Sequence, residues 1–336
     1  IYKFGIGILL FIKKNEILIY CEWYSPLIKY PLMSKIRNLS IISNSLCDKI
    51  LSYLANSVGD IDTEPATSKS MAFSPISSYL STLCLLFGSK GQTRQQLEQF
   101  LEISGFEESE LAIKTRELLE ILKKNPDNIC ITNIIFCDKD LGESENYISV
   151  LKILDTGVLK SDFTDKELAC REINNIISEN TKGLIKNFIN PQSFNNDFRL
   201  LLVNTLYFHA KWDDPFDAMD TMNKEFTKSD GTITNVHMMH ISSDKLWYFE
   251  NDELQLVQKK YKGGEFTMGF ILCKGDFDPS IVQYGDIYEK YIDPTEYCDV
   301  DLHIPRFTQE SALDIKKAMS NCGVTDLFDG NCDLSN

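Results

Sequence analysis

Apolar residues recur at helical spacing through much of the first half of the chain. The clearest case follows Ser74, whose hydroxyl suits a helix cap, and Pro75, which suits the first turn. The pattern continues to Gly88, and its apolar face contains Tyr79, Leu80, Leu83, Cys84 and Phe87. We therefore predict a helix over residues 75–88 that buries this face.

The same spacing predicts further helices. Thr93 and Gln96 have the pattern of a capping box, in which two backbone N–H groups of the first turn are satisfied reciprocally, and Ser311 with Asp314 repeats it. The predicted helices cover residues 41–55, 93–101, 107–124, 168–180 and 311–322.

Strand-like patterns dominate the second half. Residues 129–137 are apolar and β-branched without charge, and residues 200–208 (LLLVNTLYF) are the most strand-like run in the chain. Further strands are predicted at 235–241, 246–249, 254–259, 265–273 and 298–304. Because helices come first and strands dominate later, the pattern favours an α+β fold.

The composition is that of a folded protein with a large core. The 336 residues are 43% hydrophobic and 25% charged, and a chain of this size buries roughly 75% of the surface that it exposes when unfolded. The 34 Lys and Arg against 49 Asp and Glu give a net charge of −15, and basic runs are only pairs. Phosphate backbones require clustered positive charge, so we exclude a nucleic-acid-binding surface.

The first 32 residues share no pattern with the rest of the chain. Their apolar stretch, residues 4–12, is too short to span a bilayer, and Lys13 and Lys14 interrupt it, which makes it a poor signal peptide. We therefore interpret residues 1–32 as an N-terminal extension or mistranslated leader and residues 33–336 as the main domain. Met33 is a candidate for the true start.

The cysteines and a sequon give opposite indications about the compartment. The ten cysteines form no CxxC motif and no zinc-like spacing with histidine, and scattered unpaired thiols suit a reducing compartment. Asn38-Leu39-Ser40 is a glycosylation sequon, which is a weak indication of secretion.

Catalytic motifs are absent from the sequence: there is no GxSxG, P-loop, GxGxxG or HExxH. His237 and His240 are three apart on a predicted strand and so point to opposite faces, which is wrong for a shared metal. Of the acidic pairs, Asp60/Asp62, Asp213/Asp214 and Asp276/Asp278 adjoin Gly or Pro and suit turns, and only Asp299/Asp301 does not adjoin either. We predict a protein that is not an enzyme and that holds no metal and no cofactor.

One polar residue stands out inside an apolar run. Asn204 lies in the middle of LLLVNTLYF, and burying an unpaired amide costs about 1–3 kcal/mol. Asn204 must therefore have a hydrogen-bond partner. It either fixes the register of a strand or acts as a polar latch beneath a sheet that must open.

Four blocks, collinear along the chain, resemble the serpin family. The most specific begins with LVNTLYF at Leu202, continues through Lys211-Trp212 and Pro215-Phe216-Asp217 to Phe226, and resembles the family signature around the third strand of the main sheet. The others are FSPIS at 73–77 with GQTR at 91–94, Ile173-Asn174 with NTKG at 180–183, and IPRF at 304–307 with residues 313–328. The block formed by Ile173-Asn174 and NTKG resembles the helix that covers the front of the sheet.

The resemblance implies a serpin fold with three β-sheets and eight or nine helices, monomeric when intact. It also implies a mechanism. A target serine protease, or alternatively a cysteine protease, cleaves an exposed reactive-centre loop, which then inserts as a new strand into the main sheet and carries the acylated protease with it. A metastable native fold drives the insertion, so the inhibitor acts as a suicide substrate.

Family roles apply to the positions that match. Ser74, Ser77 and Asn204 match the shutter cluster, which controls opening of the main sheet. Trp212 matches the aromatic residue of the breach, where the loop first enters, and Arg306 stands where the family usually has Lys. We expect residues 200–208 to lie away from the rim of a sheet, with a helix crossing over them.

The resemblance stops short of the reactive-centre loop and the last strands. We therefore expect residues 33–336 to be an incomplete serpin domain with an open main sheet, and the reactive centre to lie outside the chain. Three readings stay open: a suicide-substrate inhibitor in the intact gene product, a non-inhibitory binding or chaperone protein on the same fold, and an inactive fragment.

The expected partner is the target protease, with no nucleic acid and no membrane. Heparin binding is not expected, because residues 107–124 carry about as many acidic as basic side chains. The family default is extracellular, and a cytoplasmic location is the alternative if Met33 is the true start.

Overall fold

The computed structural model describes residues 5–13, 16–24, 49, 71–103, 107–123, 129–140, 142, 144–194, 199–228, 231–263, 266–274, 297–307 and 315–335. They form two compact units: residues 1–75 with 210–322, called here the first unit, and residues 76–209 with 323–336, the second unit. The predicted helix 41–55 (except the helical Lys49), the sequon and the Ser311/Asp314 capping pair lie outside the described residues.

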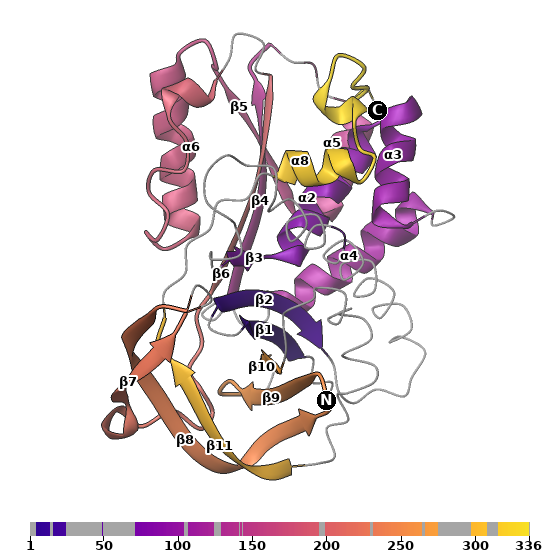
Figure 1. Cartoon of the computed structure of the whole chain (residues 1–336). Helices are drawn as coiled ribbons and strands as arrows, with labels where there is room; N and C mark the ends of the chain where they lie inside the picture. Colours follow the sequence, from indigo (N-terminus) through magenta and orange to yellow (C-terminus); the bar gives the residue numbers. More distant parts are fainter. Residues whose placement is uncertain are drawn as a thin grey trace. The chain divides into compact units, whose positions relative to one another are not determined.

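The second unit contains a three-stranded sheet in the order β5-β4-β6 (Figure 1). The central strand β4 (Ile129–Asp138) pairs parallel with β5 (Thr156–Ser161) and antiparallel with β6 (Leu200–Phe208). The predicted strands 129–137 and 200–208 are confirmed. Strand β5 was not predicted, because its sequence, TGVLKS, is short and half polar.

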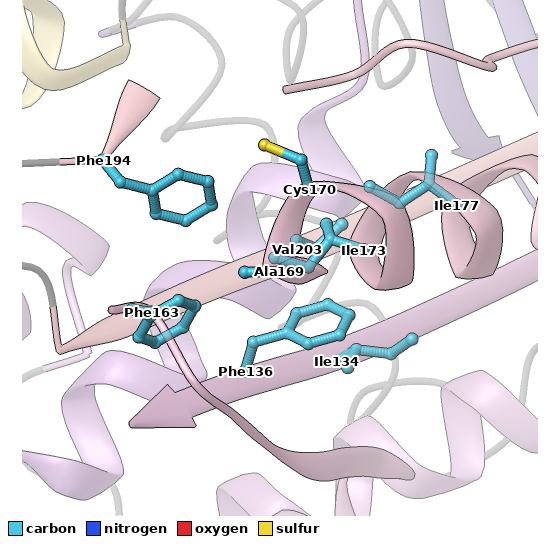
Figure 2. Close-up of a cluster of buried hydrophobic side chains, with 9 residues drawn as sticks. All are labelled: Ile134, Phe136, Phe163, Ala169, Cys170, Ile173, Ile177, Phe194 and Val203. Carbon is cyan, nitrogen blue, oxygen red and sulfur yellow. The ribbon is translucent and has the colours of Figure 1, made fainter. Parts of the chain in front are cut away.

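Helix α6 (Lys166–Asn180) covers one face of this sheet. Figure 2 shows Ala169 and Ile173 of this helix beside Val203 of β6. The hydrophobic cluster between the helix and the sheet contains Ile134, Phe136, Phe163, Ala169, Cys170, Ile173, Ile177, Phe194 and Val203. The apolar stripe predicted for residues 168–180 therefore packs on the strand that carries Asn204.

The other helices of the second unit lie on the opposite side of the sheet (Figure 1). They are α2 (Pro75–Gly88), which begins at the boundary of the unit, α3 (Gly91–Leu101), α4 (Glu108–Leu122) and α5 (Glu145–Ile153). The short helices η3 (Pro191–Ser193) and η6 (Asp326–Phe328) complete this unit. The apolar face predicted for residues 75–88 is confirmed, because Tyr79, Leu80, Leu83, Cys84 and Phe87 are all buried.

The capping box predicted at Thr93 and Gln96 is wrong. Helix α3 begins two residues earlier, after Lys90, which has no side-chain cap. The Thr93 hydroxyl instead accepts a hydrogen bond from the backbone N–H of Asp333, and the Gln96 side chain binds Thr325 and Asp326. Both polar groups are used by a segment that lies more than 220 residues away in sequence.

Strand β6 lies at one edge of the sheet within the part of the chain that the structure describes. The expectation that residues 200–208 lie away from a sheet rim is therefore wrong for these residues, because β4 is the only described strand that pairs with β6. The expected crossing helix is present, since α6 packs on Val203. Among the described residues, the outer side of β6 thus has no strand partner.

The first unit contains a network of eight strands. The order is β11-β8-β9-β10-β1-β2-β3, with β7 also on β8. The 18-residue β8 pairs with β7 and β11 along most of its length and with β9 through its last four residues. Among the described residues, the strands therefore form this eight-stranded network and the three-stranded sheet of the second unit. The α+β class is confirmed.

Strands β8 to β11 follow the predicted strand segments closely, whereas the strands at 5–13, 16–24, 71–73 and 222–227 were not predicted. Residues 235–241 and 246–249, predicted as two strands, form one. The bounds are β3 (Met71–Phe73), η4 (Ala218–Asp220), β7 (Met222–Thr227), β8 (Ile233–Glu250), β9 (Leu254–Lys260), β10 (Phe266–Cys273), β11 (Tyr297–Pro305) and α8 (Ile315–Asn321). No described helix combines the length and the apolar character that crossing a membrane would require.

The N-terminal residues form a hairpin inside this network. Strand β1 (Gly5–Lys13) pairs parallel with β10 and antiparallel with β2 (Glu16–Tyr24), and β2 pairs with β3. Residues 5–12 of the apolar stretch thus belong to a strand with a partner on each side. The division of the chain at residue 32 stays a prediction, but the backbone of residues 5–13 and 16–24 lies within the sheet formed by later residues.

Candidate functional site

An asparagine pair joins β6 to β4. Asn204 lies directly opposite Asn133, and its side-chain N–H donates to the Oδ1 of Asn133, which is buried. The Oδ1 of Asn204 is also buried and has no hydrogen-bond partner among the described residues. The predicted partner of Asn204 therefore exists, but it satisfies only one end of the amide.

The asparagine pair faces away from α6. Ile134 and Val203, the next pair along the ladder, belong to the cluster under α6, and successive side chains of a strand alternate between faces. On β5, Thr156 lies beside Asn133, and its hydroxyl is 3.4 Å from the Sγ of Cys84 on α2. The pair therefore lies on the face of the sheet that α2 contacts.

The Sγ of Cys84, beside Thr156, belongs to a protonated thiol at neutral pH. Burial raises the pKa of Cys84 to about 11, although the hydrogen bond with Thr156 acts in the opposite direction. A thiol is a poor nucleophile and a poor metal ligand. Cys84 is accordingly a packing residue between α2 and β5.

The two serines of the predicted shutter cluster lie at the start of α2. Ser77 is half-buried and precedes Cys84 by two helical turns, so the two residues share one side of the helix. Ser74 is half-buried just before Pro75, and both serines have interaction partners. Their grouping with Asn204 stays a prediction.

Replacing Asn204 with Ala should destabilise the second unit by about 1–3 kcal/mol, because the buried Asn133 then loses its partner. The matched variant replaces both members with Leu, which has nearly the shape of Asn, and should recover most of the loss. Urea unfolding followed by far-UV circular dichroism measures both variants, and native gels after heating measure polymer formation. Equal stability of Asn204→Ala and the wild type would contradict this role of the pair.

The aromatic residue predicted at the breach is part of a stack in the first unit. The ring of Trp212 lies parallel to that of Tyr261, with centroids 4.3 Å apart and planes at 9°, and a single antiparallel bridge joins the two backbones. Phe216 meets Trp212 edge-on, with centroids 6.1 Å apart. Trp212 is thus held by its neighbours on two sides.

A lysine that the sequence analysis did not single out lies against this stack. The Nζ of Lys259 is 4.9 Å from the ring centre of Phe216 and 5.8 Å from that of Trp212. Lys259 is only 1% exposed, and within the described part of the chain its ammonium has no hydrogen-bond partner. Burial lowers the pKa of this amine, while Asp214 and Asp213 act in the opposite direction. In the sequence, Lys259 adjoins Lys260, and a charged run of this kind is typical of an exposed strand end.

Arg306 is exposed and follows the end of β11. Its backbone N–H donates to the carbonyl of His237 on β8 at 2.8 Å. No ion pair of its guanidinium is described among the placed residues. The breach role of Arg306 that the resemblance implies therefore stays a prediction.

Three side chains that the sequence analysis kept apart come together on β8 and β11. They are His240, Asp301 and His303. Along the chain, the histidine nearest to His240 is His237 on the same strand. The pairing of β8 with β11, which brings His303 beside His240, is a long-range register that spacing along the chain does not reveal.

Comparison with known proteins identifies the fold and the family. The model of the family described as Serpin (serine protease inhibitor) matches residues 57–336. Human Serpin I2 is 27% identical over 272 residues, which cover 78% of this chain and 67% of that protein. Rabbit (Oryctolagus cuniculus) corticosteroid-binding globulin is 29% identical over 278 residues, which cover 80% of this chain and 72% of that protein.

Solved structures agree with the sequence comparisons. Cleaved Serpin 42Da superposes with a TM-score of 0.79 at 18% identity, covering 90% of this chain and 80% of that chain. Emu ovalbumin (Dromaius novaehollandiae) superposes with a TM-score of 0.75 at 20% identity, covering 88% and 80%. At these identities the likeness shows the fold, and the family match shows the membership. The chain belongs to the serpin family.

Proposed function

We propose that the intact gene product inhibits serine-type endopeptidases as a suicide substrate, by inserting a reactive-centre loop into its main sheet. The family match over residues 57–336 carries this proposal, since serpins are generally protease inhibitors rather than enzymes. In this proposal the sheet β5-β4-β6 is the acceptor. Ser74, Ser77 and Asn204 control its opening, and Trp212 and Arg306 border the entry of the loop.

The outer edge of β6 supports the acceptor role. An added strand would gain main-chain hydrogen bonds along an edge that has no described strand partner. The asparagine pair and α6 hold β6 in place on its other edge and on one face. Strand addition could therefore proceed without first breaking the β4–β6 ladder.

The acceptor role can be tested on the chain as it exists. The chain is incubated with a synthetic strand peptide as long as β6, nine residues, and its melting temperature is measured. We expect the temperature to rise, because a ligand that binds only the folded state stabilises it. The control peptide carries proline at alternate positions and cannot complete a ladder. Equal melting temperatures with both peptides would argue against the acceptor role.

Inhibition itself is tested on a product that carries the loop. A complex with a serine protease that survives SDS, together with a large rise in melting temperature after loop cleavage, is the expected result. Hydrolysis of the loop with no trapped complex and no rise would reject the inhibitory mechanism.

A non-inhibitory binding function is the second candidate. The observation that favours it is the similarity to corticosteroid-binding globulins, proteins named for ligand binding, in several mammals at 28–30% identity. This candidate predicts that loop cleavage leaves the melting temperature unchanged. The same cleavage experiment therefore separates the two functions.

A further inference from the structure

The side chains of His240, Asp301 and His303 share one face of the ladder between β8 and β11. His240 pairs directly with His303 in the antiparallel register. Asp301 is two residues before His303 on β11, and residues two apart on a strand point to the same side. Figure 1 shows β8 and β11 side by side in the first unit. The register alone therefore places two imidazoles and one carboxylate together.

The three side chains are within ligand distance of one another. The Nε2 of His240 is 2.5 Å from one carboxylate oxygen of Asp301, and the Nε2 of His303 is 3.3 Å from the other. The two imidazole rings are stacked, with centroids 4.4 Å apart and planes at 14°. One ligand atom from each residue can be chosen so that all lie within 4.8 Å of one another. A single ion can therefore reach all three.

The chemistry of this set suits a divalent transition metal. Two imidazole nitrogens and one carboxylate oxygen are ligands that zinc takes, with water at the remaining positions. Asp301 is exposed and both histidines are partly exposed, so an ion can enter from solvent.

We propose that His240, Asp301 and His303 form a binding site for a divalent transition-metal ion, with zinc as the expected ion. The ion would join β8 to β11 through side chains, in addition to the backbone ladder. The site is independent of the proposed inhibitory function, because neither the asparagine pair nor a reactive-centre loop takes part in it.

A neighbouring cation sets a limit on the affinity. The Nζ of Lys224, on β7, lies 3.5 Å from the Nδ1 of His303. Its positive charge repels a dication, and a hydrogen bond to Nδ1 would leave the proton on Nε2, the nitrogen that faces Asp301. Replacing Lys224 with Gln should therefore strengthen metal binding several-fold.

Isothermal titration with zinc chloride, after treatment with a chelator, tests the site. Exposed Cys298 and Cys332 offer thiols that also bind zinc, so every protein in the assay carries Cys298→Ser and Cys332→Ser. His303→Ala and Asp301→Asn should each weaken binding more than tenfold, since even residues that only support metal ligands cost 10–100-fold when lost. Cobalt(II) absorption in the visible range reports the ligand set independently of heat.

Matched controls decide the outcome. His237→Ala removes an exposed histidine of the same strand, three residues from His240, and should leave the affinity unchanged. Far-UV circular dichroism shows whether each variant is folded. Saturable binding that His303→Ala and Asp301→Asn both weaken, and His237→Ala does not, supports the site. Absence of saturable binding by either ion, or equal affinity in all variants, overturns it.

Discussion

Proline in place of Leu9 should destabilise the first unit by about 2–4 kcal/mol, a large part of an ordinary domain's total stability. Leu9 lies at the centre of β1 and pairs with Gly269 of β10 on one side and Tyr20 of β2 on the other. Proline has no backbone N–H and is excluded from central strands. The substitution therefore leaves a carbonyl group unpaired inside the sheet.

Tryptophan fluorescence during urea unfolding measures this effect selectively. All three tryptophans, Trp23, Trp212 and Trp247, belong to the first unit. The control is Met222→Pro, at the first residue of β7, which pairs only with β8 among the described strands and tolerates the lost donor. A Leu9→Pro protein that unfolds at the same urea concentration as the wild type would show that the hairpin is dispensable.

Deleting residues 1–26 should have a still larger effect. The deletion exposes the whole edge of β10, whose Phe266, Met268 and Phe270 are buried, and an exposed apolar edge promotes aggregation. A synthetic peptide of residues 1–26 added during refolding should restore soluble protein, because it can pair with β10 as β1 does. A scrambled peptide is the control. Equal recovery with both peptides would contradict specific pairing.

Local sequence patterns predicted most of the secondary structure correctly. The buried faces of α2 and α6 follow from apolar residues that recur about every 3.6 positions. This pattern is fully visible within a short segment of the sequence. Long apolar runs predicted β4 and β6 for the same reason. Where the prediction of α3 failed, the capping groups at Thr93 and Gln96 were used by Asp333 and Thr325, which local pattern does not include.

The contacts of the candidate sites could not be predicted, because strand pairing joins residues far apart in the chain. The sequence indicated that Asn204 needs a partner but not that Asn133, 71 residues earlier, supplies it. The pairing of His240 with His303 depends on the register of β8 with β11 in the same way. Family resemblance supplied the roles of Ser74, Ser77 and Trp212, and these roles remain proposals.

Replacing Lys259 with Met should stabilise the first unit by about 1–3 kcal/mol at neutral pH. The Lys259 ammonium is buried and has no hydrogen-bond partner among the described residues, so it retains much of its desolvation cost. Apolar residues of similar volume often stabilise a site when they replace buried charge. The contacts of the ammonium with Phe216 and Trp212 offset only part of the desolvation cost, since cation–π contacts contribute about 0.5–2 kcal/mol. Methionine keeps the length of the side chain.

The stabilisation should also depend on pH with a definite sign. Burial lowers the pKa of Lys259 in the folded state, so between that pKa and the ordinary value of about 10.4 the unfolded chain binds more protons than the folded one. The wild type therefore gains stability as pH rises through this interval, whereas Lys259→Met has no such gain. The advantage of the variant should be largest at neutral pH and should narrow toward about pH 10.

Urea unfolding at several pH values, followed by tryptophan fluorescence, measures both effects. The control is Lys262→Met, an exposed lysine in the turn after β9, which should change the free energy of unfolding by no more than about 0.5 kcal/mol at any pH. A constant difference between Lys259→Met and the wild type across this range would show that Lys259 is not desolvated. If Lys259→Met is instead less stable than the wild type, the contacts of the ammonium with the two aromatic rings outweigh the cost of burying its charge. Lys259 would then stabilise the stack around Trp212.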